Sequence, residues 1–544
     1  MSTQHFDYIV IGSGFGGSVS AMRLAEKGYS VLVLEKGKRW KASDFPKSNW
    51  NLKKYLWLPA FRWFGFLRLS FFKEVFILSG VGVGGGSLVY ANTHMMPPDA
   101  FFQNPVWSGL KNWKEVLAPF YAKARFMLGS SKYEKENAED QVLKEVADEM
   151  GRGSTYGRVN FVGVYLGDTK KETDPYFNGL GPLRKGCTEC AGCMVGCRFN
   201  AKNTLDKNYL WLAEHVFNAS VLAETETIRI EVQPDKTYRI KTKSSTNLWS
   251  KKTQEFTSNG IIVSGGVLGT LDLLLKQKYV HHTLPLLSDR LGENLLTNSE
   301  MLSGIVAADR KLNHGLAIST VFNPDDHTHI ELCKFPDKSG AMVRLAVMAA
   351  GNGSPVVRTL KMAGNIITHP IDFLRSVFQR NTARNSVIFL IMQSLQNAMR
   401  MKLKKGLFGY QLSFSNDTGK KVPSYIPIGQ DALYRYARKV NGVPQNAFSE
   451  VMFGLASTAH ILGGCPMGES GKNGVVNERF EVHGYKNFYI LDGSIVPCNL
   501  GVNPSLTITA LSEYAMSFIP AHPQKGKDLE ERMAEATTAS PSAT

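Results

Sequence analysis

The sequence has few cysteines and no long apolar run. Seven cysteines are present among 544 residues and four of them stand together, which excludes a small secreted fold held by many disulfides. No uninterrupted apolar stretch reaches the roughly 20 residues that a membrane-spanning helix needs. The first residues do not combine a basic segment with an apolar one, so we expect no secretory signal. We therefore expect a cytoplasmic protein, with a peripheral position at a membrane as an alternative.

Acidic residues are outnumbered by basic ones. The chain has 63 Lys and Arg against 47 Asp and Glu, a net charge of +16. This excess is compatible with a solvated surface, an anionic cofactor, an anionic membrane or nucleic acid. No cluster of basic residues with interleaved aromatics, typical of nucleic-acid-binding modules, is present, and we expect no nucleic-acid partner. The length predicts at least two domains, because a single core stops growing well below it.

The first forty residues carry a complete nucleotide-binding pattern. A buried strand at 6–11 is followed by a glycine-rich turn, a helical segment and a second strand that ends at Glu35. Gly12 permits the tight turn, Gly14 lets the backbone approach a pyrophosphate, and Gly17 lets helix and strand pack closely. Glu35 lies 18 residues beyond Gly17, where a carboxylate can accept from ribose hydroxyls. The pattern indicates dinucleotide binding without separating FAD from NAD.

Two further segments have the composition of nucleotide-binding units. Residues 80–90 contain three consecutive glycines, which suit backbone pressed against a flat ligand; a flexible hinge is the alternative. We expect an apolar strand directly after them. Residues 260–276 predict a strand, a glycine turn and an amphipathic helix. We expect that strand to return to the first sheet, with an independent βα unit as the alternative.

Two C-terminal stretches resemble the closing motifs of the glucose–methanol–choline (GMC) flavin oxidoreductases. They are STAHILGGCPMG at 457–468 and ILDGSIVPCNLGVNPSLTITALSE at 490–513, and within the family they are most similar to cholesterol oxidases. The resemblance is thin between 300 and 455. It implies an α/β protein with a Rossmann-type FAD-binding domain and a discontinuous α+β substrate-binding domain. It also implies oxidation of a secondary alcohol of a sterol or related lipid to the ketone, with the hydride passing to flavin N5 and oxygen or an electron carrier as acceptor.

The same resemblance assigns site residues. His460 matches the catalytic histidine, and Asn503 matches the asparagine that cholesterol oxidases carry. A neutral imidazole has the pKa of an efficient proton acceptor, and an amide N–H can position the substrate oxygen. Without the flanking motifs, His460 would indicate only a hydrogen-bonded core histidine. The resemblance assigns FAD contacts to Phe15, Gly16, Glu35, Gly86, Thr227 and Gly493. Together with Gly12, Gly14 and Gly17 of the first turn and Asp492 beside Gly493, these are the expected cofactor-binding residues.

One residue of the cholesterol oxidase pattern has no match. The glutamate that serves steroid double-bond isomerisation falls near Gly340 in a rough alignment. Glu331 or Asp337 could substitute for it, but neither stands on the motif. Isomerase activity therefore does not follow from the resemblance.

Four cysteines follow the ferredoxin-like spacing C-x2-C-x2-C-x3-C: Cys187, Cys190, Cys193 and Cys197. In two-cluster ferredoxins the fourth cysteine of such a run ligates the other cluster, and this chain has no second quartet. Three interpretations stay open: reduced structural cysteines, a zinc site and a 4Fe–4S cluster. A cluster would be an electron exit and would make the protein a dehydrogenase for an alcohol. A non-catalytic flavin electron-transfer protein is a further alternative.

We expect interleaved domains. Residues 51–77 and 357–407 mix apolar or aromatic side chains with basic ones, which suits a bilayer interface or a lid for a lipid-like alcohol. A buried aromatic cluster is the alternative for the first of these segments. The expected order is an FAD-binding segment at 1–100, a substrate-side insertion with the cysteine-rich strap at 101–199, a second FAD-binding segment at 200–300, the substrate-binding domain and lid at 301–454, the closing FAD-binding segment with the catalytic residues at 455–522, and a disordered tail at 523–544.

Overall fold

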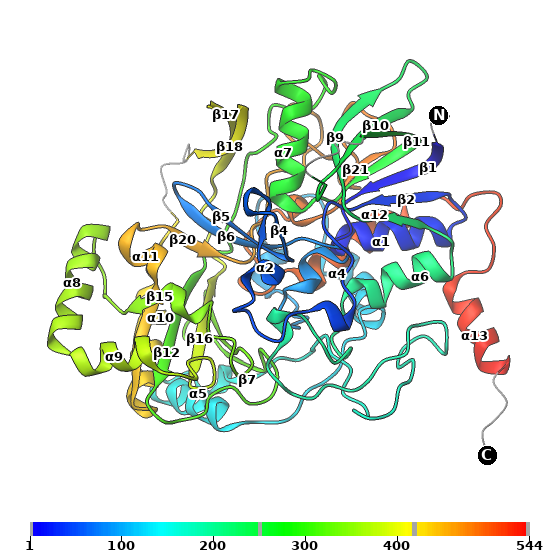
Figure 1. Ribbon diagram of the computed structural model, residues 1–544. Coiled ribbons are helices and arrows are strands. Elements are labelled where there is room, and N and C mark those ends of the chain that lie inside the picture. The colour runs from blue at the N-terminus through cyan, green and yellow to red at the C-terminus, as the bar shows by residue number, and fades with distance from the viewer. Residues whose placement is uncertain (1–3, 248–252, 408, 416–421, 540–544) are drawn as a thin grey trace.

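Two seven-stranded sheets organise the chain (Figure 1). The computed structural model describes residues 4–247, 253–407, 409–415 and 422–539. Each sheet collects strands from distant parts of the sequence. The predicted α/β class, with a Rossmann-type domain and a second α+β region, is confirmed.

The first sheet is the nucleotide-binding one. Its centre is parallel, with Val10 opposite Val33 on one side and Ile9 opposite Ile261 on the other. The expected return of residues 260–276 to this sheet is confirmed by that second pairing. The strand order is β8 (Ser220–Leu222), β2 (Val31–Leu34), β1 (Gln4–Ile11), β11 (Thr253–Val263), β10 (Tyr238–Ser244) and β9 (Thr225–Val232), and β21 (Phe488–Ile490) also pairs with β11.

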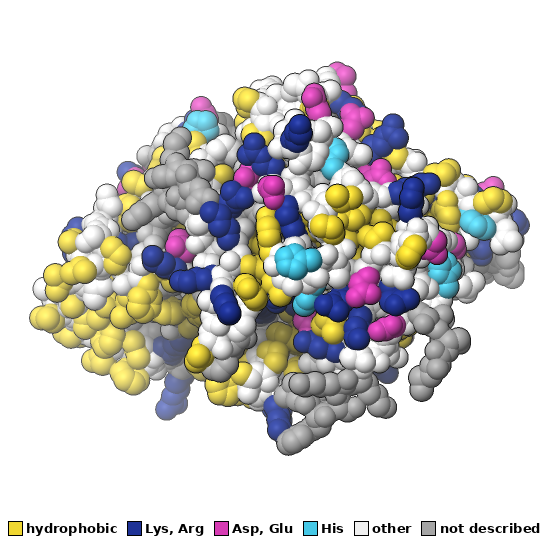
Figure 2. All heavy atoms as spheres, turned by 90° about the horizontal axis from the view of Figure 1, so that it is seen from above, with side chains coloured by type: hydrophobic (Ala, Val, Ile, Leu, Met, Phe, Trp, Pro, Cys, Tyr) yellow, Lys and Arg dark blue, Asp and Glu magenta, His cyan; other side chains and the backbone are white. Residues whose placement is uncertain are grey.

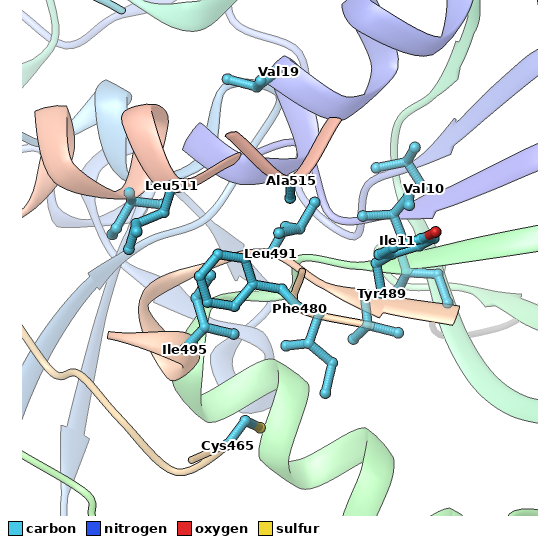
Figure 3. Packing of buried hydrophobic residues seen from close by; sticks show 14 of the residues in the cluster. Val10, Ile11, Val19, Cys465, Phe480, Tyr489, Leu491, Ile495, Leu511 and Ala515 are labelled. Atoms are coloured by element: carbon cyan, nitrogen blue, oxygen red, sulfur yellow. The ribbon is translucent and has the colours of Figure 1, made fainter. Parts of the chain in front are cut away.

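Helix α12 (Ser505–Ser517) is the central helix of the core beside this sheet. Every residue from 505 to 516 is buried, and the helix packs on α1 (Phe15–Glu26) and α4 (Trp113–Met127). Figure 3 shows side chains of α12, α1, β1 and the 480–495 region meeting in this core. Arg23 of α1 donates to both carboxylate oxygens of Glu513, so a buried ion pair links the first helix to the last core helix.

The second sheet is antiparallel and forms the substrate side. Helices α5 (Ala138–Glu149) and α10 (Pro427–Lys439) pack against its strands in a separate apolar cluster. The strand order is β15 (Ala346–Met348), β19 (Gly442–Ala447), β12 (Met301–Ala307), β16 (Ser386–Gln393), β14 (Thr328–Cys333), β13 (Thr320–Phe322) and β7 (Gly157–Arg158).

A small third sheet connects the two regions. Strand β20 (Ala456–Thr458) pairs in parallel with β6 (Val75–Gly80), which pairs with β5 (Leu67–Phe71). This pairing brings the segment before His460 beside the segment before the second glycine loop. The remaining elements are β3 (Trp57–Leu58), β4 (Trp63–Phe64), β17 (Arg400–Gly406), β18 (Gly409–Ser415), α2 (Leu52–Tyr55), α3 (Asp99–Phe102), α6 (Tyr209–His215), α7 (Gly266–Tyr279), α8 (Pro355–Thr368), α9 (Pro370–Phe378), α11 (Phe448–Met452) and α13 (Leu529–Ala539).

Two expectations of local structure were wrong. The tail expected to be disordered contains α13, because Leu529 is buried and its N–H is accepted by Glu26; residues 540–544 lie outside the described chain. The strand expected after the second glycine loop is a 3-10 turn at Gly85–Leu88, since Gly84 and Gly85 take left-handed φ values of +102° and +51°.

The aromatic segment 51–77 is partly buried. Tyr55, Trp57 and Phe66 are buried, whereas Phe61 and Phe71 are exposed. Much of it therefore follows the buried-cluster alternative. Within the described residues, no helix is both long and apolar enough to cross a membrane.

Candidate active site

The first glycine turn combines crowded positions with one open position. A Cβ built at Gly12, Gly16 or Gly17 would lie 1.7–2.2 Å from a backbone oxygen, and Gly12 has a φ of +99°. These three glycines are therefore required by the packing of the turn. A Cβ at Gly14 meets nothing within 4 Å, so this glycine leaves space instead. Because Gly14 also caps the N-terminus of α1, that space suits a phosphate.

A cavity of about 810 Å³ lies over this turn. Gly12, Gly14, Glu35, Gly86 and Thr227 all line it, although they come from three separate segments. The buried Oγ1 of Thr227 has no hydrogen-bond partner among the described residues. A buried hydroxyl without a partner is costly, and a ligand in this cavity would satisfy it.

Glu35 stands at the end of β2 with its carboxylate in place for a ribose. Its Oε2 accepts from the Ser13 backbone N–H and hydroxyl at 3.1 and 2.7 Å, and its Oε1 accepts from the Gly37 N–H at 2.7 Å. These bonds hold the side chain in one orientation. A carboxylate oxygen has two lone pairs, so Oε1 keeps capacity to accept from a hydroxyl of the cofactor.

Two basic residues that the sequence did not single out line this site. Lys36 and Arg68 contribute to both the nucleotide cavity and the cavity beside it. Burial lowers the pKa of both, and the nearby guanidinium of Arg68 lowers the pKa of Lys36 further. A bound anion between the two cavities would relieve both effects.

The second cavity, of about 300 Å³, is where the predicted catalytic pair meets the glycine loops. Its walls include apolar residues such as Leu78, Phe335 and Leu390. Of the residues predicted from the sequence, it is lined by Gly14, Phe15, Gly16, Gly86, His460, Asp492, Gly493 and Asn503. Gly17 lies behind the turn and supports the packing only. These residues fit FAD: the first cavity would hold its adenine half, and the second would hold its flavin half beside the substrate. We therefore call the second the substrate cavity.

His460 is held by a buried carboxylate. Its Nδ1 donates to Oε1 of Glu300, and Oε2 of Glu300 accepts from the Ala459 N–H at 2.7 Å. The other ring nitrogen, Nε2, is left for the cavity that His460 lines. Burial lowers the pKa of His460, but Glu300, with help from Glu331, outweighs this and raises it above the ordinary value. The arrangement is that of a base oriented by a third group.

Asn503 is held by a second buried carboxylate. Its Nδ2 donates to Oε2 of Glu331 at 3.2 Å, and Glu331 Oε1 lies 3.3 Å from Nε2 of His329. The buried Oδ1 of Asn503 has no partner within the described chain. One N–H and this oxygen are therefore available to a substrate hydroxyl. Gly340, where the rough alignment had placed the isomerisation glutamate, instead lies beside Thr382 and Trp50.

The two carboxylates were missed as partners of the site. Glu300 belongs to no motif and lies 160 positions before its histidine. Glu331 did carry a signal, because it is the only acidic residue in THIELC, a strand that is buried throughout. A charged residue in such a strand needs a partner, and here the partner comes from the C-terminal motif.

Asp492 and Gly493 shape the cavity from the end of β21. Asp492 accepts from the Thr270 hydroxyl at 2.5 Å and from the Ser494 N–H at 2.8 Å, and burial raises its pKa. A Cβ at Gly493 would lie 3.2 Å from the Ile461 oxygen, so the turn passes close to the histidine segment.

The four clustered cysteines line a separate cavity of about 480 Å³. All are free thiols, and Cys190 is exposed. Cys193 accepts from the Asn92 amide at 3.0 Å, and Cys187 and Cys197 accept from backbone N–H groups at 3.4 Å. Within the part of the chain that the structure describes, no group of three or more His, Cys, Asp or Glu is arranged to hold a metal ion.

Comparisons with known proteins agree with this geometry. Residues 410–512 match the GMC oxidoreductase family, and residues 10–41 match the NAD(P)-binding Rossmann-like domain. The chain is 40% identical to a cholesterol oxidase of Acinetobacter baumannii over 527 residues, which cover 95% of this chain and 94% of that protein. It is 39% identical to a cholesterol oxidase of Mycobacterium tuberculosis over 530 residues, covering 95% and 91%.

Solved structures show the same fold at low identity. A pyridoxine 4-oxidase from Mesorbium loti aligns with a TM-score of 0.60 at 15% identity, over 94% of this chain and 99% of that one. A formate oxidase variant of Aspergillus oryzae aligns with a TM-score of 0.59 at 14% identity, over 95% and 98%.

Proposed function

The chain belongs to the GMC oxidoreductase family, and we propose that it oxidises the secondary alcohol of a sterol or related lipid to a ketone with FAD as cofactor. The observation that carries the proposal is the meeting of His460 and Asn503 in the cavity bounded by the glycine loops. The two relatives at 39–40% identity are cholesterol oxidases. Apolar wall residues such as Phe335 and Leu390 suit a lipid skeleton.

Each residue of the site has a role in this reaction. When bound, FAD supplies the hydride acceptor. Nε2 of His460 accepts the hydroxyl proton, and Glu300 orients the imidazole through Nδ1. Asn503, oriented by Glu331, holds the substrate oxygen so that the carbinol hydrogen faces the flavin side of the cavity.

Anaerobic mixing of the FAD-loaded protein with a panel of alcohols tests the proposal. We expect 3β-hydroxysteroids to bleach the flavin absorbance, and short aliphatic alcohols of equal concentration to do so far more slowly. Bleaching by no sterol would contradict the substrate class and favour a non-catalytic flavin carrier. Peroxide formation in air identifies oxygen as the acceptor, which is the acceptor we propose.

We keep one alternative for the acceptor, in which the four cysteines hold a 4Fe–4S cluster that passes electrons to a carrier. It rests on four free thiols that line one cavity and on N–H groups that donate to three of them, although no three of these described thiols are placed to hold a metal ion together. Such hydrogen bonds tune iron–sulfur clusters. The cysteine-lined cavity adjoins the substrate cavity, because consecutive residues line the two. Cys193 lines the first of them and Met194 lines the second.

Metal analysis tests this alternative. Anaerobically purified protein should contain iron and acid-labile sulfide if the cluster exists, and Cys193→Ser should lose both. Cys498→Ser is the matched control, because Cys498 is a buried free cysteine outside this cavity. Iron-free protein that still reduces oxygen would exclude the cluster as the electron exit.

Double-bond isomerisation is a second activity that one contact favours. Glu331 is buried and in hydrogen-bond contact with Asn503, so a carboxylate adjoins the residue that would hold the substrate oxygen. We propose that Glu331 can act as the base for this step. Chromatography of the steroid products tests this role. The wild type should release the conjugated ketone, and Glu331→Gln should release the unconjugated ketone.

We also propose a cytoplasmic protein that takes its substrate from a membrane surface. A sterol resides in bilayers, so the enzyme must reach one. Cell fractionation in which all of the protein stays soluble at low salt would contradict the peripheral position.

A further inference from the structure

Helices α8 and α9 expose their apolar sides and bury polar ones. Each helix has a single fully buried residue, which is Arg358 in α8 and Ser376 in α9. Both helices lie wholly within the described part of the chain. Apolar residues recur at helical spacing on the outer side, and between 50% and 78% of each is exposed. We call these residues the α8–α9 apolar face: Val356, Leu360, Ile367, Ile371, Leu374 and Phe378.

This apolar face occupies one end of the molecule. Figure 1 places α8 and α9 as an outlying pair at the left of the ribbon. Figure 2 shows hydrophobic side chains gathered at the same end. Contiguous apolar surface of this kind marks an interaction site in a soluble protein.

Buried hydrogen bonds hold the helices in this orientation. Arg358 points inward and donates from Nη1 to the backbone oxygens of Ser424 and Glu450 at 3.0 and 2.8 Å. Arg344 donates to the Ser376 oxygen at 2.8 Å and to the Gln379 oxygen at 3.0 Å, and so ties down the end of α9. Rolling the apolar face inward would break these bonds and leave a buried guanidinium unpaired.

Charge decides which partner suits the face. From Lys338 to Arg384, the stretch that contains both helices, the sequence has seven Lys and Arg and a single acidic residue, Asp372. Five of the seven are exposed: Lys338, Lys361, Arg375, Arg380 and Arg384. Lys361 and Arg375 are exposed on the helices themselves. A second copy would bring two positive surfaces together, whereas an anionic bilayer offers both acyl chains and negative charge.

We propose that the α8–α9 apolar face enters the interfacial layer of an anionic lipid bilayer and anchors the enzyme there. The anchor adjoins the substrate cavity, because Met342 lines that cavity and Arg344, two residues later, is bonded to α9. The inference rests on the proposed function in one respect: anchoring is useful because it delivers a membrane sterol to the enzyme.

Vesicle cosedimentation with the FAD-loaded full chain tests the anchor. Sterol-free vesicles of phosphatidylcholine, with and without phosphatidylserine, are the probes. We expect binding to the anionic vesicles that weakens with salt, and a loss of about tenfold or more in the double variant Leu360→Glu, Ile367→Glu. Its matched control is Leu286→Glu, Leu183→Glu, because these leucines are also 60–65% exposed but lie outside the face. The control should bind like the wild type.

Three results would overturn the anchor: no binding to anionic vesicles, equal losses in both double variants, or a wild-type dimer that only Leu360→Glu, Ile367→Glu converts to monomer. The last would show that a second copy covers the face. Because the vesicles hold no sterol, this readout is independent of turnover. Both double variants are also assayed with detergent-dispersed sterol. Oxidation at the wild-type rate, together with a failed vesicle test, would contradict the anchor and leave the proposed function standing.

Discussion

Glu300 accepts a hydrogen bond from Nδ1 of His460 across 160 positions of sequence. The carboxylate precedes β12 of the substrate-side sheet, and the histidine follows β20 of the small third sheet. The proposed base therefore depends on the packing of two sheets against each other. This relationship determines the expected pH dependence.

The acid limb of the pH profile should report His460. A base must be neutral to accept a proton, so kcat/KM should fall as the pH drops through the raised pKa of His460. Glu300→Gln removes the larger of the two charge effects that raise this pKa, so the acid limb should move to lower pH. The rate at the pH optimum should also fall about tenfold, because the imidazole is oriented less firmly. Glu331→Gln should move it less. A limb that does not move in Glu300→Gln would contradict the assignment.

Replacing the base should block chemistry and spare the cofactor. His460→Ala should remain yellow, because the glycine turns that line both cavities are unchanged. Flavin reduction by substrate, followed by stopped flow, should slow by about 10²–10⁴-fold. Reduction at the wild-type rate would remove His460 from the mechanism.

Asn503→Ala should weaken positioning of the substrate oxygen. We expect flavin reduction to slow by about 10–100-fold, and FAD to stay bound. Glu331→Gln provides the comparison, since it retains an oxygen that can accept from Asn503 but removes the charge. A slower rate in Asn503→Ala with no change in Glu331→Gln would assign the effect to the amide. Equal rates for all three proteins would contradict the role of Asn503.

Two glycines of the first turn, Gly14 and Gly16, should respond differently to substitution. Gly14→Val places its side chain in open space, so the stability of the apoprotein should hardly change. FAD affinity should fall at least about tenfold, because the valine fills space that the cofactor needs. Gly16→Ala puts a Cβ 1.7 Å from the Leu491 oxygen and should cost about 2 kcal/mol or more of unfolding free energy. FAD titration and thermal unfolding of the apoproteins distinguish the two. An unstable Gly14→Val would contradict this account of the turn.

The buried pair between Arg23 and Glu513 should matter for stability. Arg23→Leu leaves Glu513 buried and, among the described residues, bonded to the Tyr209 hydroxyl alone, which should cost about 3–5 kcal/mol of unfolding free energy. Lys114→Leu breaks the exposed pair with Asp99 and should have a much smaller effect. Chemical denaturation of both variants measures the difference. Equal effects would mean that the α1–α12 link is not a stability determinant.

The nucleotide-binding unit was predictable because its signals are local. Tight turns and helix starts depend on neighbouring residues, so Gly12, Gly14 and Gly17 could be assigned from one short stretch. Figure 3 shows the core around α12, whose burial throughout was not predicted, because Ser, Thr and Glu interrupt the apolar residues of this helix. The family resemblance then identified His460 and Asn503 as candidates, and the structure places both at one cavity.

Other features depended on which distant segments meet. The sequence by itself determined the first glycine turn and the return of residues 260–276 to the first sheet, and the family resemblance supplied the proposed catalytic pair. Only the tertiary structure decided that Glu300 and Glu331 hold that pair, that α13 docks through Leu529, and that α8 and α9 turn their apolar sides outward. The physical reason is that a turn is specified by its own backbone conformation, whereas the partner of a buried carboxylate and the outward side of a helix are specified by the packing of elements remote in sequence.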